Sequence, residues 1–278
     1  MKKFLLWFLA FLITISAGLY QRMTGPTYPK RINISVNKGV QKLKLVRSLS
    51  LNEKPEVKID LADPNIKAKL FFKRYKTEGE YQVADFTFRA DPKHPGFFAG
   101  VPQQPAAGKI QYYIEITDSD GTQTYLKENP VVIRFKGDVP ALVLIPHILL
   151  MFVAMLFSTL AGLMALIKFP KYKFYGTWTL ILFITGGFIL GPIVQYYAFN
   201  ELWTGVPFGW DLTDNKTLIA LIFWILAVVM NRKKERPLYT VLAAVILLLV
   251  FSIPHSLFGS ELNYSSGQVT QGIILNFF

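Results

Sequence analysis

Long apolar runs, separated by charged turns, dominate two parts of the chain and set its predicted architecture. Five stretches are apolar or long enough to be considered as membrane-spanning helices: Phe4–Tyr20, Val139–Ile167, Phe174–Phe199, Thr217–Met230 and Leu238–Ile253. A helix needs roughly 20 residues to cross about 30 Å of hydrocarbon, so the second and third stretches are sufficient as they stand. We therefore predict an α-helical transmembrane bundle.

The last two stretches are short, and each becomes long enough only with its flanking residues. The fourth does so if its helix begins near Leu212, which brings a polar Asp-Asn-Lys sequence to the membrane boundary. The fifth does so if Pro237 is its first helical residue, a position that proline tolerates, and if the helix continues through Pro254. On this basis we predict four transmembrane spans within residues 139–257.

The first stretch has two interpretations. A pair of lysines, an apolar core and the small residues Ser16-Ala17-Gly18 are typical of a signal peptide with its cleavage site. The same residues suit an uncleaved membrane anchor equally well. Residues 1–20 are therefore expected to be a signal peptide or a signal anchor.

Residues 30–136 follow a different pattern, in which apolar and polar positions alternate over short runs separated by turn residues. Such alternation is typical of half-buried β-strands. The runs are Arg31–Val36, Gln41–Val46, Glu56–Leu61, Ile66–Arg74, Tyr81–Phe88, Lys109–Ile116 and Val131–Phe135. About seven short strands without intervening helices predict an all-β sandwich. With its linkers, this domain is expected to occupy residues 21–138.

The charge distribution predicts an orientation in the membrane. The net charge is +12. Nine basic residues and one acidic residue lie at the N-terminus and in the loops 168–173 and 231–236. Cytoplasmic loops are rich in Lys and Arg, so we place these segments in the cytoplasm, and the β domain and the tail 258–278 outside. The lipid bilayer explains most of the excess charge, which argues against a nucleic-acid partner.

Composition narrows the chemistry. Hydrophobic residues make up 52% of the chain and charged residues 17%, and there is no cysteine. The absence of cysteine excludes disulfides, thiolate metal sites and cysteine nucleophiles. The sequence also contains no Gly-rich phosphate loop, Gly-x-Ser-x-Gly elbow or His-Glu-x-x-His motif. An enzyme is therefore the least favoured class, although a catalytic set assembled from distant residues is conceivable.

The predicted topology gathers several polar residues at the outer membrane face. An Ile-Pro-His sequence occurs twice, at residues 145–147 and 253–255, and both copies fall on this side. The complete set is Asp211, Asp214, Asn215, Lys216, Glu201, Glu261, His147 and His255. Ionisable residues in or near membrane spans are energetically costly and suggest function by default.

Three interpretations of this set stay open. In the first, His147 and His255 bind one transition metal or a haem iron, and carboxylates support them. In the second, Asp211, Asp214, Lys216 and His255 form a proton or ion relay in a small ion-coupled transporter. In the third, no cofactor is bound: Asp211 or Thr213 caps a helix, Asp214 favours the helix N-terminus, and the lysine reaches the lipid headgroups.

Two resemblances extend this picture. Residues 109–121 resemble a late strand and hairpin of immunoglobulin-like or fibronectin type III-like modules. Five segments carry a second resemblance: Tyr20–Pro29, Arg134–His147, Gly191-Pro192-Ile-Val-Gln, Pro207–Lys216 and Ile253-Pro-His with Gly259-Ser-Glu. Together they look like a family of bacterial inner-membrane proteins with no assigned activity. The resemblance implies a bacterial cytoplasmic membrane and transfers no functional residue.

The favoured hypothesis is a non-enzymatic multi-pass membrane protein. Its extracytoplasmic, or periplasmic, β domain would contact a protein partner, as an accessory or assembly subunit of a membrane complex does. Short proline-containing linkers at 21–29 and 137–140 would keep this domain near the bilayer. Phe97 and Phe98 are the candidate exposed aromatic residues of the contact surface.

Overall fold

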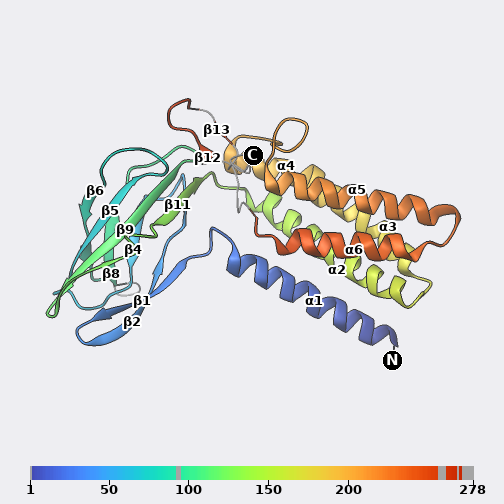
Figure 1. Cartoon of the computed structure of the whole chain (residues 1–278), viewed down its shortest axis with the longest axis horizontal. Helices are drawn as coiled ribbons and strands as arrows, with labels where there is room; N and C mark the ends of the chain where they lie inside the picture. Colours follow the sequence, from blue (N-terminus) through green and yellow to red (C-terminus); the bar gives the residue numbers. More distant parts are fainter. Residues whose placement is uncertain (1, 92–94, 256–260, 268, 271–278) are drawn as a thin grey trace. The chain divides into compact units, whose positions relative to one another are not determined.

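Two structural units make up the computed structural model, which describes residues 2–91, 95–255, 261–267 and 269–270 (Figure 1). The described part of the helical unit comprises residues 2–26 and 139–255. The β unit comprises Thr27–Asp138 and Glu261–Thr270. Each unit buries its own clusters of hydrophobic side chains, so each is described by itself.

Apolar helices form the described part of the helical unit. They are α1 (Lys2–Thr24), α2 (Ala141–Leu166), α3 (Tyr172–Phe183), the π-helix η1 (Ile184–Leu190), α4 (Gly191–Phe199), α5 (Leu212–Lys233) and α6 (Pro237–Ser252). Within the described residues, four segments are long and apolar enough to cross a membrane: α1, α2, the continuous Tyr172–Phe199 and α5. The chain is thus consistent with a multi-pass membrane protein.

The two short predicted spans behave differently. Helix α5 begins at Leu212 and reaches 22 residues, and α6 begins at Pro237, both as the sequence predicted. The prediction that α6 continues through Pro254 is wrong, because α6 ends at Ser252 after 16 residues. Pro254 has no N–H with which to continue the helix, and Ile253 N–H bonds instead to the Val250 carbonyl at 3.3 Å. Helix α6 is therefore shorter than a typical span.

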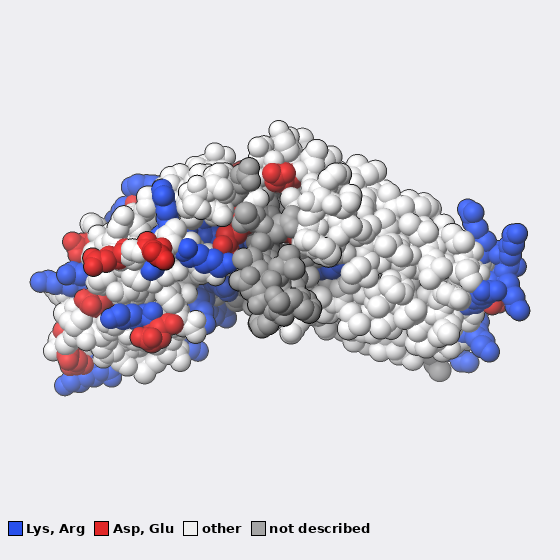
Figure 2. Space-filling view, turned by 45° about the horizontal axis from the view of Figure 1, so that its top comes forward, with Lys and Arg blue, Asp and Glu red and all other residues white. Residues whose placement is uncertain are grey.

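The surface of the helical unit is apolar. All large hydrophobic side chains found exposed in the described residues belong to this unit, except Val40 and Val83. Figure 2 shows a long uncharged surface with basic side chains gathered at one end. Two interactions locate that end: Lys3 lies 5.9 Å from the Phe169 ring centroid, and Lys173 lies 3.3 Å from Glu235. The N-terminus and the two basic loops therefore meet there.

The β unit is built from short strands. In residues 30–136 they are β1 (Lys30–Val36), β2 (Gly39–Leu45), β3 (Ser48–Ser50), β4 (Glu56–Ile59), β5 (Lys67–Arg74), β6 (Gln82–Asp85), β7 (Thr87–Arg89), β8 (Gly96–Gly100), β9 (Lys109–Asp118), β10 (Gly121–Tyr125) and β11 (Val131–Lys136). The largest sheet has the order β3-β11-β9-β5-β6, with β10 also paired to β9. A second sheet has the order β4-β8-β7, and β1 pairs with β2. The pair β3–β11 is parallel, so the largest sheet is mixed.

One hydrophobic cluster joins these sheets. It combines alternate residues of the hairpin and of both larger sheets, including the fully buried Leu43, Leu70, Ile114 and Phe135. Phe97 belongs to this cluster and is 2% exposed, so the prediction that it forms a contact surface is wrong. The register explains its burial, because Phe97 pairs with Ile59 of β4 and shares its inward face.

The predicted strand Tyr81–Phe88 is two strands. Asp85 of β6 pairs with Lys69 of the six-stranded sheet, whereas Thr87 of β7 pairs with Phe98 of the three-stranded sheet. Phe86 lies between them, is 8% exposed, and donates its N–H to the Ala68 carbonyl at 2.9 Å. The chain thus changes sheets at a buried aromatic residue, which alternation alone does not reveal.

A short segment after the last helix belongs to the β unit. Here β12 (Glu261–Leu262) pairs with β13 (Val269–Thr270). Leu262 N–H bonds to the Ala107 carbonyl at 3.1 Å, and the Tyr264 hydroxyl donates to the Lys109 carbonyl at 2.8 Å. Residues on either side of the helices α2–α6 are therefore parts of one folded unit. The rest of the predicted tail, residues 258–260, 268 and 271–278, lies outside the described residues.

Candidate functional site

The start of α5 carries the first part of the predicted polar cluster. Asp211 is the N-cap: its Oδ1 accepts hydrogen bonds from the N–H groups of Thr213 at 2.8 Å and Asp214 at 3.2 Å. Asp211 is 4% exposed. A carboxylate in this position satisfies free N–H groups and interacts favourably with the helix dipole. The predicted capping role of Asp211 is confirmed.

Asp214 fastens the preceding loop and α4 to α5. Its Oδ2 accepts from Thr204 N–H at 2.6 Å, from the Thr204 hydroxyl at 3.1 Å and from the Gln195 side-chain amide at 3.3 Å. The same amide donates to the Thr204 hydroxyl at 2.8 Å. One buried carboxylate oxygen therefore connects three parts of the chain.

Asn215 holds the next turn of the loop. Its side-chain oxygen accepts the Val206 N–H at 2.7 Å. Gly205 passes between these contacts so closely that a Cβ there would lie 2.6 Å from the Asp214 Cβ and 2.9 Å from the Asn215 Oδ1. Only glycine fits this approach, so the loop and the polar face of α5 fit each other.

Lys216 makes a contact of a different kind. Its Nζ donates to the Ile253 carbonyl at 2.6 Å, and the residue is 4% exposed. Gln21 of α1 donates to the same carbonyl at 3.4 Å. Among the described residues, no carboxylate lies within ion-pair distance of Lys216. The Ile253 carbonyl has no partner within the helix because α6 ends there. Its bonds to Lys216 and Gln21 connect the end of α6 to α5 and α1.

The two histidines belong to different elements but lie close enough for the charge of His147 to act on His255. His147 follows Pro146 in α2, and its Nδ1 lies 2.9 Å from the Gly186 carbonyl of η1. Gly186 also accepts the N–H of Gly191, the i→i+5 bond that defines a π-helix. His255 follows the end of α6, and Lys216 is a further charge that acts on it. In the part of the chain that the structure describes, no three His, Asp or Glu side chains form a group that could hold a metal ion.

Glu261, which the sequence predicted in the same cluster, belongs to the β unit, whereas Asp211, Asp214, Asn215 and Lys216 belong to the helical unit. The Glu261 carboxylate contacts Lys109 Nζ at 2.9 Å and Lys76 Nζ at 3.1 Å. Burial opposes ionisation of Glu261, but the bonds and charges of these lysines hold its pKa below the ordinary value. Burial, together with the charge of Arg134, lowers the pKa of Lys109. This ion pair joins β12 to β9. Glu201, also predicted for the cluster, is exposed in the loop after α4.

A second polar network, absent from the sequence prediction, lies where α5 and α6 meet the basic loop. The Asn231 side-chain oxygen accepts from the Tyr172 hydroxyl at 2.9 Å and from Arg236 N–H at 2.8 Å. Its amide donates to the carbonyls of Ala227 and Arg236 and to the Thr240 hydroxyl. Asn231 is 5% exposed. One signal in the sequence could have identified this second network: an asparagine interrupts an apolar helix just before a basic run.

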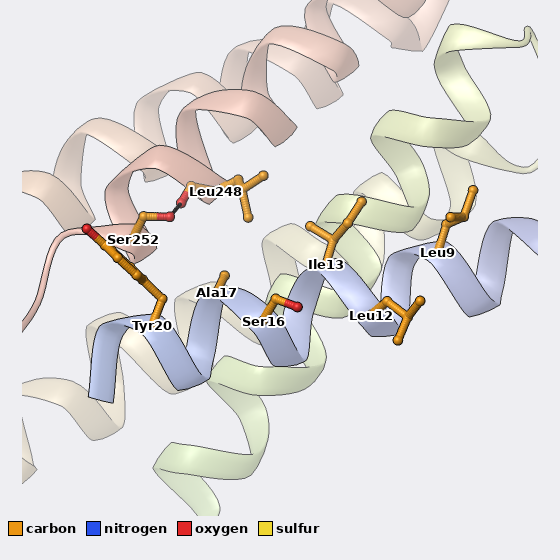
Figure 3. Close-up of a pocket in the computed structure, with 8 residues that line it drawn as sticks. All are labelled: Leu9, Leu12, Ile13, Ser16, Ala17, Tyr20, Leu248 and Ser252. Carbon is orange, nitrogen blue, oxygen red and sulfur yellow. Dashed lines mark hydrogen bonds between the residues drawn. The ribbon is translucent and has the colours of Figure 1, made fainter. Parts of the chain in front are cut away.

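A shallow groove lies between α1 and α6 (Figure 3). Leu9, Leu12, Ile13, Ala17 and Leu248 form most of its lining. Ser16, Tyr20 and Ser252 supply only hydroxyl groups, and the Ser252 hydroxyl already donates to the Leu248 carbonyl at 2.8 Å. Such a lining accommodates hydrocarbon rather than a polar substrate.

The described polar groups of the α5 network mostly bond to backbone atoms and to one another. Each of its four side chains holds a loop or a helix end in place: Asp211, Asp214, Asn215 and Lys216. Their contacts therefore have a structural role. Comparison with protein-family models finds no match for this chain, and comparison with curated proteins finds none either.

Proposed function

We propose that the chain is a non-enzymatic multi-pass protein of a bacterial cytoplasmic membrane that holds its β unit outside the cytoplasm for contact with a protein partner. The helical unit is the anchor, since its exposed surface is apolar and four of its described segments have the length of membrane spans. The β unit has its own hydrophobic core. It therefore resembles an interaction module attached to a membrane base.

One observation carries this topology. Asp138 and Glu261 belong to the same β unit, and a partly buried ion pair with Lys109 holds Glu261 there. A folded unit lies on one side of a membrane, so an even number of crossings must separate the two residues. Three long segments lie between them: α2, Tyr172–Phe199 and α5. Helix α6 must therefore cross as well, although its 16 residues extend only about 24 Å at 1.5 Å per residue. A bilayer adapts to a short helix by thinning locally.

The orientation follows from charge. The N-terminus and the loops 168–173 and 231–236 hold nine basic residues and one acidic residue at one end of the helical unit. Basic loops favour the cytoplasm. The opposite ends of the helices, including the α5 polar network, then face outward together with the β unit.

We further infer that the larger sheets form a sandwich of the immunoglobulin or fibronectin III type, because one core draws on both. The outward face of the six-stranded sheet is the candidate contact surface. There, the half-buried Phe71 and Tyr81 cover the buried Tyr113: the Phe71 and Tyr113 rings stack with centroids 4.7 Å apart, and Tyr81 meets Tyr113 edge-on at 4.9 Å. Val83, opposite Phe71 in the register, is 52% exposed. Aromatic residues are enriched at protein interfaces.

The absence of cysteine provides a clean test of the topology. We would place single cysteines at the exposed Lys127, Ser265 and Lys171 and treat intact cells with a membrane-impermeant maleimide. Lys127→Cys and Ser265→Cys should be labelled, and Lys171→Cys only after lysis. Labelling of Lys127→Cys and Ser265→Cys from opposite sides would overturn the even number of crossings. Labelling of both from the cytoplasm would overturn the orientation.

Photo-crosslinking in native membranes tests the partner. A photoreactive residue at Val83 should give a discrete product of higher mass that disappears with Phe71→Ser. The same residue at Thr122, which is exposed on β10, is the matched control and should give none. Equal products at both positions, or a protein that purifies only as a monomer in mild detergent, would contradict the proposal.

A redox or metal function is a second candidate, and one contact favours it. Because His147 Nδ1 bonds to the Gly186 carbonyl, its Nε2 is left as the ligand atom, the arrangement typical of metal-bound histidine. A visible absorption spectrum and metal analysis of the purified protein decide between this redox or metal function and the proposed contact with a protein partner. A Soret band or stoichiometric metal that His147→Ala abolishes would replace our proposal.

A further inference from the structure

The positive charge of the β unit is concentrated at its beginning. Residues 30–47 contain six basic side chains and no acidic one, whereas residues 48–138 contain thirteen of each. This first segment forms the β1–β2 hairpin, whose Lys30, Arg31, Lys38, Lys42 and Lys44 are exposed. Within the described residues, none of these five side chains forms an ion pair. The hairpin is therefore a cationic surface without internal neutralisation.

The strand register places the charges on one face. Ile34, Val36, Leu43 and Leu45 point into the core and are at most 2% exposed. The alternate positions face outward, where Arg31 lies directly opposite Lys44 and Asn33 opposite Lys42. Like charges in directly opposed positions destabilise a strand pair. A polyanionic surface placed against this face would remove that repulsion.

The charge is also asymmetric along the hairpin. At the turn, Asn37 N–H bonds to Asp118 at 2.7 Å, and Lys38 N–H bonds to Asp120 at 3.1 Å. Asp63 accepts from the Asn37 side chain at 2.8 Å. Acidic residues thus gather at the turn, while Arg31, Lys42 and Lys44 lie toward the open end. The open end is the one that follows α1 in the chain.

The connection to α1 is short. Helix α1 ends at Thr24 and β1 begins at Lys30, a separation of at most about 21 Å at 3.5 Å per residue. Tyr20, in the last turns of α1, is 56% exposed, and the Arg31 guanidinium donates to the Tyr28 hydroxyl at 2.7 Å. Tyrosine and basic side chains are typical of the membrane–water interface. The basic half of the hairpin is thus tethered within reach of the headgroups.

We propose that the outward face of the β1–β2 hairpin, with Arg31, Lys42 and Lys44 at its centre, docks on anionic phospholipid headgroups of the bilayer that α1 spans. The inference rests on the proposed membrane insertion of α1. Lipid is the favoured occupant because the tether holds the charges near headgroups in every copy of the protein. The hydrophobic Val40, 74% exposed on the same face, suits the same environment. Basic side chains are attracted to anionic leaflets over about one Debye length.

The test uses the full chain in lipid nanodiscs with a single cysteine. Asn33→Cys lies among the three basic side chains and leaves each of them in place. We expect a soluble maleimide to label it at least about threefold more slowly in discs containing about 30 mol% phosphatidylglycerol than in phosphatidylcholine discs. The difference should vanish in about 0.5 M NaCl, which shortens the Debye length to a few ångströms. Thr122→Cys on β10 should react equally in both kinds of disc.

A charge-neutral variant and a soluble anion complete the experiment. Arg31→Gln, Lys42→Gln and Lys44→Gln together should abolish the lipid dependence at Asn33→Cys. Equal labelling rates in both discs at low salt would overturn the inference, as would slowing by glycerophosphate or by an acidic peptide in phosphatidylcholine discs. Failure of the protein to insert into either disc would instead contradict the proposed membrane function.

Discussion

The helical unit and the β unit distribute their side chains in opposite ways. In the helical unit the exposed surface is apolar, and buried polar residues such as Asp214, Lys216 and Asn231 lie near helix ends. In the β unit the core is apolar, and among its described residues only Val40 and Val83 are large exposed hydrophobic side chains. The difference is consistent with our proposal that hydrocarbon surrounds the helices and water surrounds the sheets.

The polar side chains of the two units also bond to different kinds of partner. The α5 network and Asn231 bond largely to backbone atoms of loops and helix ends, where the helix leaves N–H and C=O groups without partners. In the β unit, ion pairs such as Lys109–Glu261 join side chains of different strands. Polar residues therefore bond to the free backbone groups at helix ends in the helical unit, and they link neighbouring strands in the β unit.

The largest expected effect comes from placing a charge on each surface. Ile222, in the middle of α5, is 55% exposed, and Val83 of β6 is 52% exposed. If lipid surrounds α5, Ile222→Asp should cost about 2.5–3.5 kcal/mol, the range for a charge at the centre of a membrane span. Val83→Asp should change the free energy of unfolding by less than about 0.5 kcal/mol. The membrane-inserted fraction and thermal unfolding in nanodiscs measure the two effects.

The matched exposure of these two side chains makes the pair decisive. In water, both substitutions would be similarly mild, because each replaces a half-exposed apolar group. An Ile222→Asp protein that inserts and unfolds like the wild type would therefore refute a lipid environment for α5, and the contrast between the units would lose its explanation.

A smaller effect is expected inside the α5 network. Asp214→Ala removes the acceptor of Thr204 N–H and of the Gln195 amide, and unpaired buried donors cost about 1–3 kcal/mol. Thr217→Ala, one turn later, is the control, because its hydroxyl donates only to a helix carbonyl at 2.7 Å. Thermal unfolding in nanodiscs compares them. Equal stability of the two variants would contradict the bracing role of Asp214.

Much of the architecture follows from local sequence. Apolar runs of sufficient length predicted α2 and the Tyr172–Phe199 segment. The length that a span requires predicted a helix start near Leu212, and the tolerance of proline at the first helical position predicted one at Pro237. The division of Tyr81–Phe88 into β6 and β7 was missed, because it depends on which sheet each half pairs with. Pairing partners distant in sequence leave no trace in the alternation of one strand.

The candidate site shows the same limit. Asp211 was predictable as a cap from residues within one turn of it. The partners of Asp214, namely Gln195 and Thr204, lie in another helix and in a loop, and Asn231 bonds to Tyr172 of α3. Glu261 was assigned to the membrane face from its position in the chain, but its partner Lys109 is set by the folding of the β unit. Only tertiary structure identifies such pairs.

The smallest expected effect concerns an ion pair in the β unit. Glu56 at the start of β4 accepts a bond from Arg89 at the end of β7 at 2.8 Å, and the two residues bridge the central strand β8. The Arg89 guanidinium lies 4.5 Å from the centroid of the Phe98 ring beneath it. The bond from Arg89 lowers the pKa of Glu56 to about 2. The folded state therefore favours the ionised carboxylate more than the unfolded chain does.

The sign of the pH dependence follows from that shift. The stabilisation by Glu56 is complete above its ordinary pKa of 4.5 and is lost as the pH falls toward about 2, because the unfolded chain takes up the proton at a higher pH than the folded protein does and is stabilised by it. The Arg89 side chain is 43% exposed, so solvent screening reduces the expected loss in Glu56→Gln to about 1 kcal/mol at neutral pH. Asp60→Asn, which breaks the more exposed pair with Lys58, should cost less than about 0.5 kcal/mol. Chemical unfolding followed from pH 7 to pH 2 should show the stability of the wild type converging on that of Glu56→Gln. A gap between them that stays constant with pH would show that Glu56 acts through packing rather than charge.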